Sequence, residues 1–178
     1  MFGNMATVVS RIYEKCKTML LGSDDVIRHY VYVANQGSNN ISQYAIAEHG
    51  HLLPLATAKV ATGTTPVFIA ASPSGKYVYV ANQRGNSVSQ YRVNSDGNLE
   101  IIAQPVAAGT SPVEIAIDPF GRYAYVANSS SNDLSQYLIG ENGILQPMSP
   151  ATIGTGLIPV AVTVDPSGKY VYAVNNSG

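Results

Sequence analysis

The chain has few of the features that mark metal centres, disulfide scaffolds or nucleic-acid binding. Its 178 residues contain no tryptophan and one cysteine, Cys16, which excludes a disulfide framework and a multi-cysteine metal site. Charged residues make up only 12% and the formal net charge is −1, so the clusters of Lys and Arg that bind nucleic acid are missing. No apolar run approaches the length that spans a bilayer. We therefore expect no nucleic-acid partner, no membrane span, no metal and no cofactor.

What the chain does contain is one strand-like pattern that occurs four times. Its clearest copy is Lys76-Tyr-Val-Tyr-Val-Ala-Asn82, in which two sets of side chains alternate with a period of two. A fixed spacing in the range of 20 to 50 residues is typical of solenoids, propellers and arrays. The leading tyrosines of the four copies are Tyr30, Tyr77, Tyr123 and Tyr170, which lie 47, 46 and 47 residues apart.

Each complete period is predicted to contain four short strands. The first strand opens at a proline and ends at a type I turn such as Asp118-Pro-Phe-Gly121. The tyrosine run is the second strand, the third carries Ser-Gln-Tyr, and a turn with a fixed glycine leads to the fourth. First strands are expected at 66–71, 112–117 and 159–164, third strands at 88–93 and its equivalents, and fourth strands around 55–60, 101–106 and 148–153.

Four antiparallel strands in about 47 residues match one blade of a β-propeller. We therefore predict an all-β fold with a partial β-propeller over residues 29–178. The chain holds about three and a quarter blades, whereas closed propellers typically have about 4–8. Two explanations are open, a fragment of a longer gene product and a ring closed by several chains. We expect the ring to be completed by missing blades or by homo-oligomerisation, and the fragment explanation is favoured.

Residues 1–28 lie outside the repeats. Their apolar residues fall at helical spacing and predict a short amphipathic helix. This segment is either a docking helix or a non-native start. Charges interrupt its apolar residues and no cleavage pattern follows, so it is not typical of a secretory signal. The expected location is cytoplasmic by default, and secreted or periplasmic if the true N-terminus is missing. The apolar residues concerned are Val9, Ile12, Tyr13, Cys16, Met19 and Leu20.

Three motifs together resemble a known family of propellers: Gly109-Thr-Ser-Pro112, the run from Asp165-Pro-Ser-Gly168 into a Tyr-x-Tyr strand, and Ser89-Gln-Tyr91. They are similar to the lactonase-like β-propellers, the 6-phosphogluconolactonase and muconate-cyclising group with its Tyr-Val-Thr-Asn repeat relatives. The resemblance covers residues 29–178 and implies about half of a seven-bladed ring. It also implies a sugar-lactone hydrolase with a small lactone or carbohydrate ligand.

One feature of the catalytic members of that family is absent here. In those catalytic members the first strand of some blades opens with Pro-His, and His, Arg and Glu side chains lie together at one mouth of the propeller's central channel. In this chain the residues that follow the prolines are Val67, Val113 and Val160. Two functions therefore stay open, a lactone hydrolase and a non-catalytic repeat scaffold that binds a protein or ligand on one face of the propeller.

Residues that deviate between repeats are the candidates for a catalytic site. Glu114 stands where the other copies have Phe68 and Ala161, near the start of a first strand, and could act as a general base. Arg84 lies in the loop after the second strand of the preceding blade, which strand direction places at the same mouth. A lactone hydrolase needs a base for water and a cation for the developing oxyanion. A surface salt bridge between the two residues is the alternative interpretation.

Overall fold

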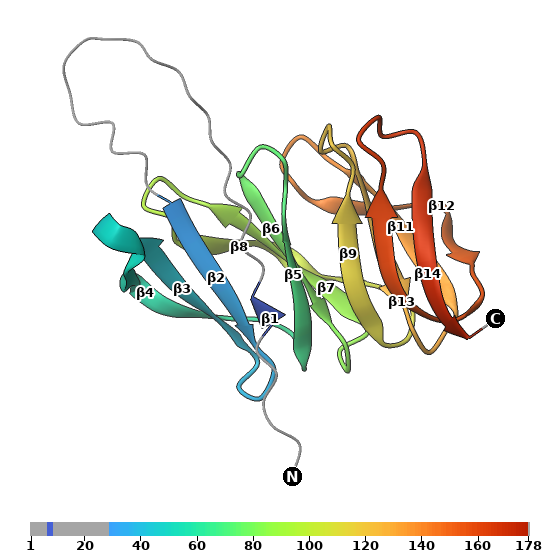
Figure 1. Ribbon diagram of the computed structural model, residues 1–178, viewed down its shortest axis with the longest axis horizontal. Coiled ribbons are helices and arrows are strands. Elements are labelled where there is room, and N and C mark those ends of the chain that lie inside the picture. The colour runs from blue at the N-terminus through green and yellow to red at the C-terminus, as the bar shows by residue number, and fades with distance from the viewer. Residues whose placement is uncertain (1–6, 9–28, 178) are drawn as a thin grey trace.

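The computed structural model describes residues 7–8 and 29–177, and these form antiparallel sheets that stand side by side (Figure 1). Three sheets have four strands and one has two, so the predicted partial β-propeller is confirmed. We call the four-stranded sheets the first, second and third blades in chain order, and β13–β14 the fourth sheet.

The strands follow the repeats in the sequence. The first blade contains β1 (Thr7–Val8), β2 (His29–Asn35), β3 (Asn40–Ile46) and β4 (Leu52–Ala61), with the short turn η1 (Glu48–Gly50) before β4. The second contains β5 (Pro66–Ala71), β6 (Tyr77–Asn82), β7 (Ser87–Val93) and β8 (Leu99–Ala107). The third contains β9 (Pro112–Ile117), β10 (Tyr123–Asn128), β11 (Asp133–Ile139) and β12 (Leu145–Gly154), and the fourth sheet contains β13 (Leu157–Val164) and β14 (Val171–Ser177).

The turns between first and second strands form as predicted. The N–H of Gly75 donates to the carbonyl of Ser72, and that of Gly121 to the carbonyl of Asp118, each at 2.9 Å. This is the bond that closes a type I turn. The glycine at the fourth position has a positive φ of 70° in both turns, which explains why glycine recurs there.

The strands β5, β9 and β13, which we call the inner strands, each carry a β-bulge near their start. In β5 the pairing with β6 skips from Pro66 to Phe68, and in β13 the pairing with β14 skips from Pro159 to Ala161. The same irregularity separates Pro112 from Glu114 in β9. The skipped residues are therefore the valines that follow the prolines. A bulge redirects the side chains next to it, so Phe68, Glu114 and Ala161 occupy equivalent positions.

The core lies between the blades, and one pair of hydrogen bonds recurs in it. Tyr79 is fully buried and donates its hydroxyl to the carbonyl of Gly143 in the next blade at 2.8 Å. The side-chain oxygen of Gln90 accepts the N–H of Leu145 at 2.7 Å. Tyr32 and Gln43 of the first blade make the equivalent bonds to Gly97 and Leu99 of the second, at 2.6 and 2.7 Å. The recurring Tyr and Gln therefore join neighbouring blades.

The recurring asparagines lie at the ends of the second strands and bond to the third strands. The Asn82 amide donates to Ser89 Oγ at 2.9 Å, and the Asn128 amide donates to Ser135 Oγ at the same distance. Both asparagines are fully buried. These amide bonds join the second strand to the third strand of the same blade, so the two side chains stabilise the blade.

Two expectations differ from the structure or lie beyond it. The fourth strands are longer than predicted, because they begin opposite the end of the third strand, as Leu99 does opposite Val93. The helix predicted within residues 1–28 falls on residues that the structure does not describe. Within that segment only Thr7 and Val8 are described, and they pair with β2 as strand β1. Within the described ranges, no helix has the length and apolar character needed to cross a membrane.

Candidate functional site

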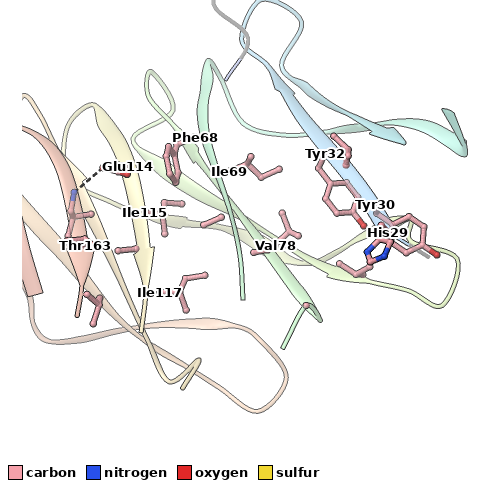
Figure 2. Close-up of a pocket in the computed structure, with 18 of the residues that line it drawn as sticks. His29, Tyr30, Tyr32, Phe68, Ile69, Val78, Glu114, Ile115, Ile117 and Thr163 are labelled. Carbon is pink, nitrogen blue, oxygen red and sulfur yellow. Dashed lines mark hydrogen bonds between the residues drawn. The ribbon is translucent and has the colours of Figure 1, made fainter. Parts of the chain in front are cut away.

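A cavity of about 510 Å³ extends along the inner strands β5, β9 and β13 and reaches β2 (Figure 2). Most of its lining is apolar, with Phe68, Ile115 and Val162 among the residues on its walls. Glu114 also lines it. We call this cavity the inner-strand cleft. It is concave and apolar with few polar groups, as small-molecule sites usually are.

Glu114 is held in the cleft by the neighbouring sheet. It follows the bulge of β9 and pairs across the strands with Ala127. Its Oε2 accepts the backbone N–H of Val162 in β13 at 3.0 Å, which fixes the direction of the carboxylate (Figure 2). Burial raises the pKa of Glu114, and the N–H of Val162 opposes this rise only in part. A carboxylate with a raised pKa is a stronger base than an exposed one.

Arg84 lies elsewhere. It is exposed on the turn between β6 and β7, and it is not among the residues that line the cleft. The turn does reach the start of β9, because Asn86 Oδ1 accepts the N–H of Ser111 at 2.9 Å. The turn that carries Arg84 and the start of β9 are therefore neighbours. The side chains of Arg84 and Glu114 form no ion pair, and a role for Arg84 stays a prediction.

The cleft contains polar residues that the sequence did not single out. Thr163 follows Val162 in β13 and lines the cleft, where the equivalent residues of the other inner strands are Ala70 and Ala116. That deviation between repeats was the available signal. His29 lines the cleft at the far side from Glu114 (Figure 2). No Lys or Arg is among the lining residues that the structure describes.

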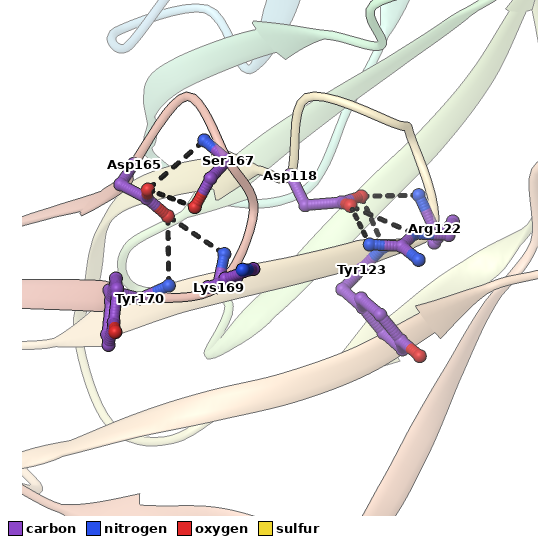
Figure 3. Close-up of polar contacts among 7 residues, drawn as sticks. All are labelled: Asp118, Arg122, Tyr123, Asp165, Ser167, Lys169 and Tyr170. Atoms are coloured by element: carbon purple, nitrogen blue, oxygen red, sulfur yellow. Dashed lines mark hydrogen bonds and ion pairs between the residues drawn. The ribbon is translucent and has the colours of Figure 1, made fainter.

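The carboxylates of Asp118 and Asp165 stabilise the turns in which they lie. Asp118 accepts the backbone N–H of Tyr123 at 2.9 Å and lies 3.2 Å from the guanidinium of Arg122 (Figure 3). Asp165 accepts bonds from the hydroxyl of Ser167 and the backbone N–H of Tyr170, and these lower the pKa of Asp165 to about 2. Both carboxylates are satisfied within their own turn. Over residues 7–8 and 29–177 no three His, Cys, Asp or Glu residues gather as metal ligands would.

Comparison with known families gives a match that covers most of the chain. The family described as "Lactonase, 7-bladed beta-propeller" matches residues 23–113 and 98–178. A search of curated protein sequences found no match.

Solved structures give matches over about half of a longer protein. A candidate 6-phosphogluconolactonase from Bacteroides fragilis is 25% identical with a TM-score of 0.73, over 82% of this chain and 44% of that one. A second candidate 6-phosphogluconolactonase, from Bacteroides uniformis, is 23% identical with the same TM-score and the same two coverages. The periplasmic gluconolactonase of Pseudomonas aeruginosa is 20% identical with a TM-score of 0.70, again over 82% and 44%. The chain thus spans less than half the length of these relatives.

Proposed function

The chain belongs to the lactonase family of seven-bladed β-propellers, and from that premise we propose that its inner-strand cleft binds a small uncharged lactone and hydrolyses it. Glu114 is the general base in this proposal. The observation that carries the proposal is a single half-buried carboxylate with a raised pKa, held by a backbone N–H inside an apolar cleft. Perturbed carboxylates in clefts are the usual candidates for acid–base catalysis.

The proposed reaction needs one base and one hydrogen-bond donor. Glu114 takes a proton from water, and the water oxygen bonds to the lactone carbonyl carbon. The ring C–O bond then breaks, and the departing ring oxygen receives the proton that Glu114 had taken, which leaves a hydroxy acid. The Thr163 hydroxyl is the proposed donor to the carbonyl oxygen while it carries negative charge, because Thr163 adjoins the residue that orients Glu114.

The charge of the cleft supports an uncharged substrate. Glu114 is the only carboxylate among its described lining residues, and Lys and Arg are absent from that lining. A phosphate or carboxylate on the substrate would approach Glu114 without a cation to balance it, and like charges at close range are unfavourable. We therefore expect glucono-δ-lactone to be a better substrate than its 6-phosphate.

The test is lactone hydrolysis by the full 178-residue chain, followed as acid release at constant pH. Glu114→Gln should lower kcat/KM by about 10²-fold or more, since a general base contributes about 10²–10⁴-fold. A glutamine oxygen can still accept the N–H of Val162, so this variant removes the charge and keeps the bond. Glu100→Gln is the matched control, because Glu100 is exposed and paired with Arg92, and it should retain full activity. Wild-type activity in Glu114→Gln would refute the role of Glu114.

A second candidate function is ligand binding without turnover. Valines occupy the bulge positions of all three inner strands, and the cleft walls are mostly apolar. A scaffold of this kind should bind a lactone or carbohydrate saturably and release no acid. Calorimetry on the wild-type chain, run beside the hydrolysis assay, separates the two functions. Saturable binding together with zero turnover favours the scaffold.

A further inference from the structure

The inner strands carry backbone groups along an edge that no other strand covers. Each inner strand lies at the end of its own sheet and pairs with its second strand on one side only. In an antiparallel pair, opposite residues alternate between those that exchange backbone hydrogen bonds and those whose N–H and C=O groups point away from the partner strand. Every second residue of an inner strand therefore directs its backbone groups away from the sheet.

The turn that begins at Asp118 shows which residues of β9 these are. The N–H of Asp118 donates to the carbonyl of Tyr123 at 3.0 Å, so these two residues form a hydrogen-bonded pair. Counting back along the register of β9 and β10, Ala116 is again in a hydrogen-bonded pair and Ile115 is not. The N–H of Ile115 therefore points away from β10.

The equivalent residue of the fourth sheet shows where such a group points. Val162 is equivalent to Ile115, and its N–H leaves the sheet and donates to Oε2 of Glu114 at 3.0 Å (Figure 2). In the preceding blade the residue equivalent to Glu114 is Phe68, and a phenylalanine side chain has no acceptor. The N–H of Ile115 therefore lacks the kind of acceptor that the N–H of Val162 has.

The surroundings of Ile115 make this N–H a candidate for ligand binding. Only 4% of Ile115 is exposed, and buried backbone N–H groups nearly always have a hydrogen-bond partner. Ile115 lines the cleft, and β9 lies between β5 and β13, which both contact it (Figure 1). A buried donor at the wall of a cleft is suited to hold an acceptor atom of a ligand.

We propose that the backbone N–H of Ile115 donates a hydrogen bond to the carbonyl oxygen of the bound lactone, a role that rests on the proposed lactone hydrolysis. It adds a second donor to the Thr163 hydroxyl. Ile115 directly follows Glu114 in β9, so the base and the donor are neighbours on one strand. Glu114 holds the attacking water, and the N–H of Ile115 holds the carbonyl group that the water attacks.

This N–H contributes most while the carbonyl oxygen carries negative charge. When the water oxygen bonds to the carbonyl carbon, the π electron pair of the C=O bond moves to the carbonyl oxygen. When the ring C–O bond breaks, that pair forms the C=O bond again. The N–H keeps its proton throughout and only donates a hydrogen bond. Removal of one such fixed donor typically lowers kcat by about 10²–10³-fold.

The experiment replaces Ile115 by its α-hydroxy acid through nonsense suppression in the full 178-residue chain. This change turns one amide into an ester, so it removes the N–H and keeps the side chain. For glucono-δ-lactone, kcat should fall by about 10²-fold or more with little change in KM. The acid limb of the pH profile should keep its position, because Glu114 is unchanged.

Ile117 provides the matched control. Its N–H also points away from β10, but it lies two residues further along β9 from the base, so the ester at Ile117 should keep the wild-type kcat. The ester at Ala116 tests the direction of the N–H groups without any activity. Because the N–H of Ala116 bonds to β10, its loss should lower the urea midpoint of unfolding more than the loss at Ile115 or Ile117. Equal midpoints for the three esters would contradict the assigned directions.

Binding of δ-valerolactam, followed by calorimetry, tests the same hydrogen bond without hydrolysis. This lactam has the ring and carbonyl group of a lactone and is stable in water. The wild-type chain should bind it saturably, the ester at Ile115 should weaken binding by about 3- to 10-fold, and the ester at Ile117 should leave it unchanged. If this pattern holds and no acid is released, the proposed hydrolysis fails and the carbonyl site stands.

The change in kcat decides if the wild-type chain hydrolyses the lactone, and the affinity for the lactam decides if it does not. Three results would overturn the role of Ile115: wild-type behaviour of the Ile115 ester in the deciding measurement, equal losses in the Ile115 and Ile117 esters, or a wild-type chain that neither hydrolyses the lactone nor binds the lactam.

Discussion

Among the residues that the structure describes, the buried side-chain oxygen of Asn128 has no hydrogen-bond partner, and one substitution is expected to supply a donor. The structure leaves Oδ1 of this fully buried residue unpaired. In the preceding blade the equivalent oxygen, on Asn82, accepts the hydroxyl of Thr62 at 3.0 Å. The residue equivalent to Thr62 is Ala108, since each precedes a glycine whose N–H donates to the serine of the third strand. We therefore predict that Ala108→Thr stabilises the protein.

The size of the effect follows from the cost of a buried unpaired acceptor. Leaving such a group unsatisfied costs about 1–3 kcal/mol, and a neutral hydrogen bond contributes about 0.5–1.5 kcal/mol net. We expect Ala108→Thr to raise the free energy of unfolding by about 1 kcal/mol. For a chain of this size that corresponds to about 2–4 °C in Tm. Urea unfolding followed by circular dichroism measures the change.

Two further variants separate the effect of the hydroxyl group from the effect of the larger side chain. Ala108→Val has the shape of threonine without the hydroxyl, so it should lack the gain. Thr62→Ala should lower the free energy of unfolding by about 1–2 kcal/mol, because it removes the hydroxyl that donates to Oδ1 of Asn82. Equal stability of the Ala108→Thr and Ala108→Val chains would refute the reasoning, and so would a neutral Thr62→Ala.

Three other predictions concern the turns, the blade contacts and the candidate site. The pKa of Asp165 is lowered to about 2, below the ordinary value of about 3.9. The stabilising effect of the ionised Asp165 should therefore be complete above about pH 4 and lost as the pH falls through 2. Asp165→Asn should remove that part of the pH dependence of stability, measured by urea unfolding. Gln90→Met should lower the free energy of unfolding in urea by about 1–3 kcal/mol, because the buried N–H of Leu145 loses its acceptor. Gln136→Met, at the equivalent position in the third blade, should lower it by less than about 0.5 kcal/mol. Equal costs would contradict the role of the blade-to-blade bond. Arg84→Ala should leave KM and kcat for an uncharged lactone unchanged, because Arg84 is exposed and lies outside the cleft lining. A loss of kcat alone would support a role of Arg84 with the oxyanion.

The repeat predicted the blades well because turn chemistry and alternation are local. The inner strands β5 and β9 begin and end where the prolines and type I turns placed them. The fourth strands began earlier than predicted. The residues of β8 do not alternate clearly between apolar and polar, and exposed positions such as Ile101 are apolar. The alternation therefore does not mark where β8 begins. Pairing with the third strand, which no local pattern reports, sets the start of β8 at Leu99.

The site was predictable only in part. Comparison of the repeats singled out Glu114, and the structure places it in the cleft. Its partner could not be found in this way, because the partner is the backbone N–H of Val162 and every residue except proline has such a group. The repeat placed the tyrosines on the second strands, and the structure shows that Tyr79 also bonds to the next blade. That contact spans 64 residues and depends on how the sheets stack.

The central claim is that Glu114 is the base of a lactone hydrolase, and the pH dependence of kcat/KM tests it most directly. Because burial raises the pKa of Glu114, activity should fall on the acid side with an apparent pKa above the ordinary value for glutamate. The acid limb should disappear in Glu114→Gln, leaving a low rate that is independent of pH over that range. An acid limb that is unchanged in position and size in Glu114→Gln would contradict the account.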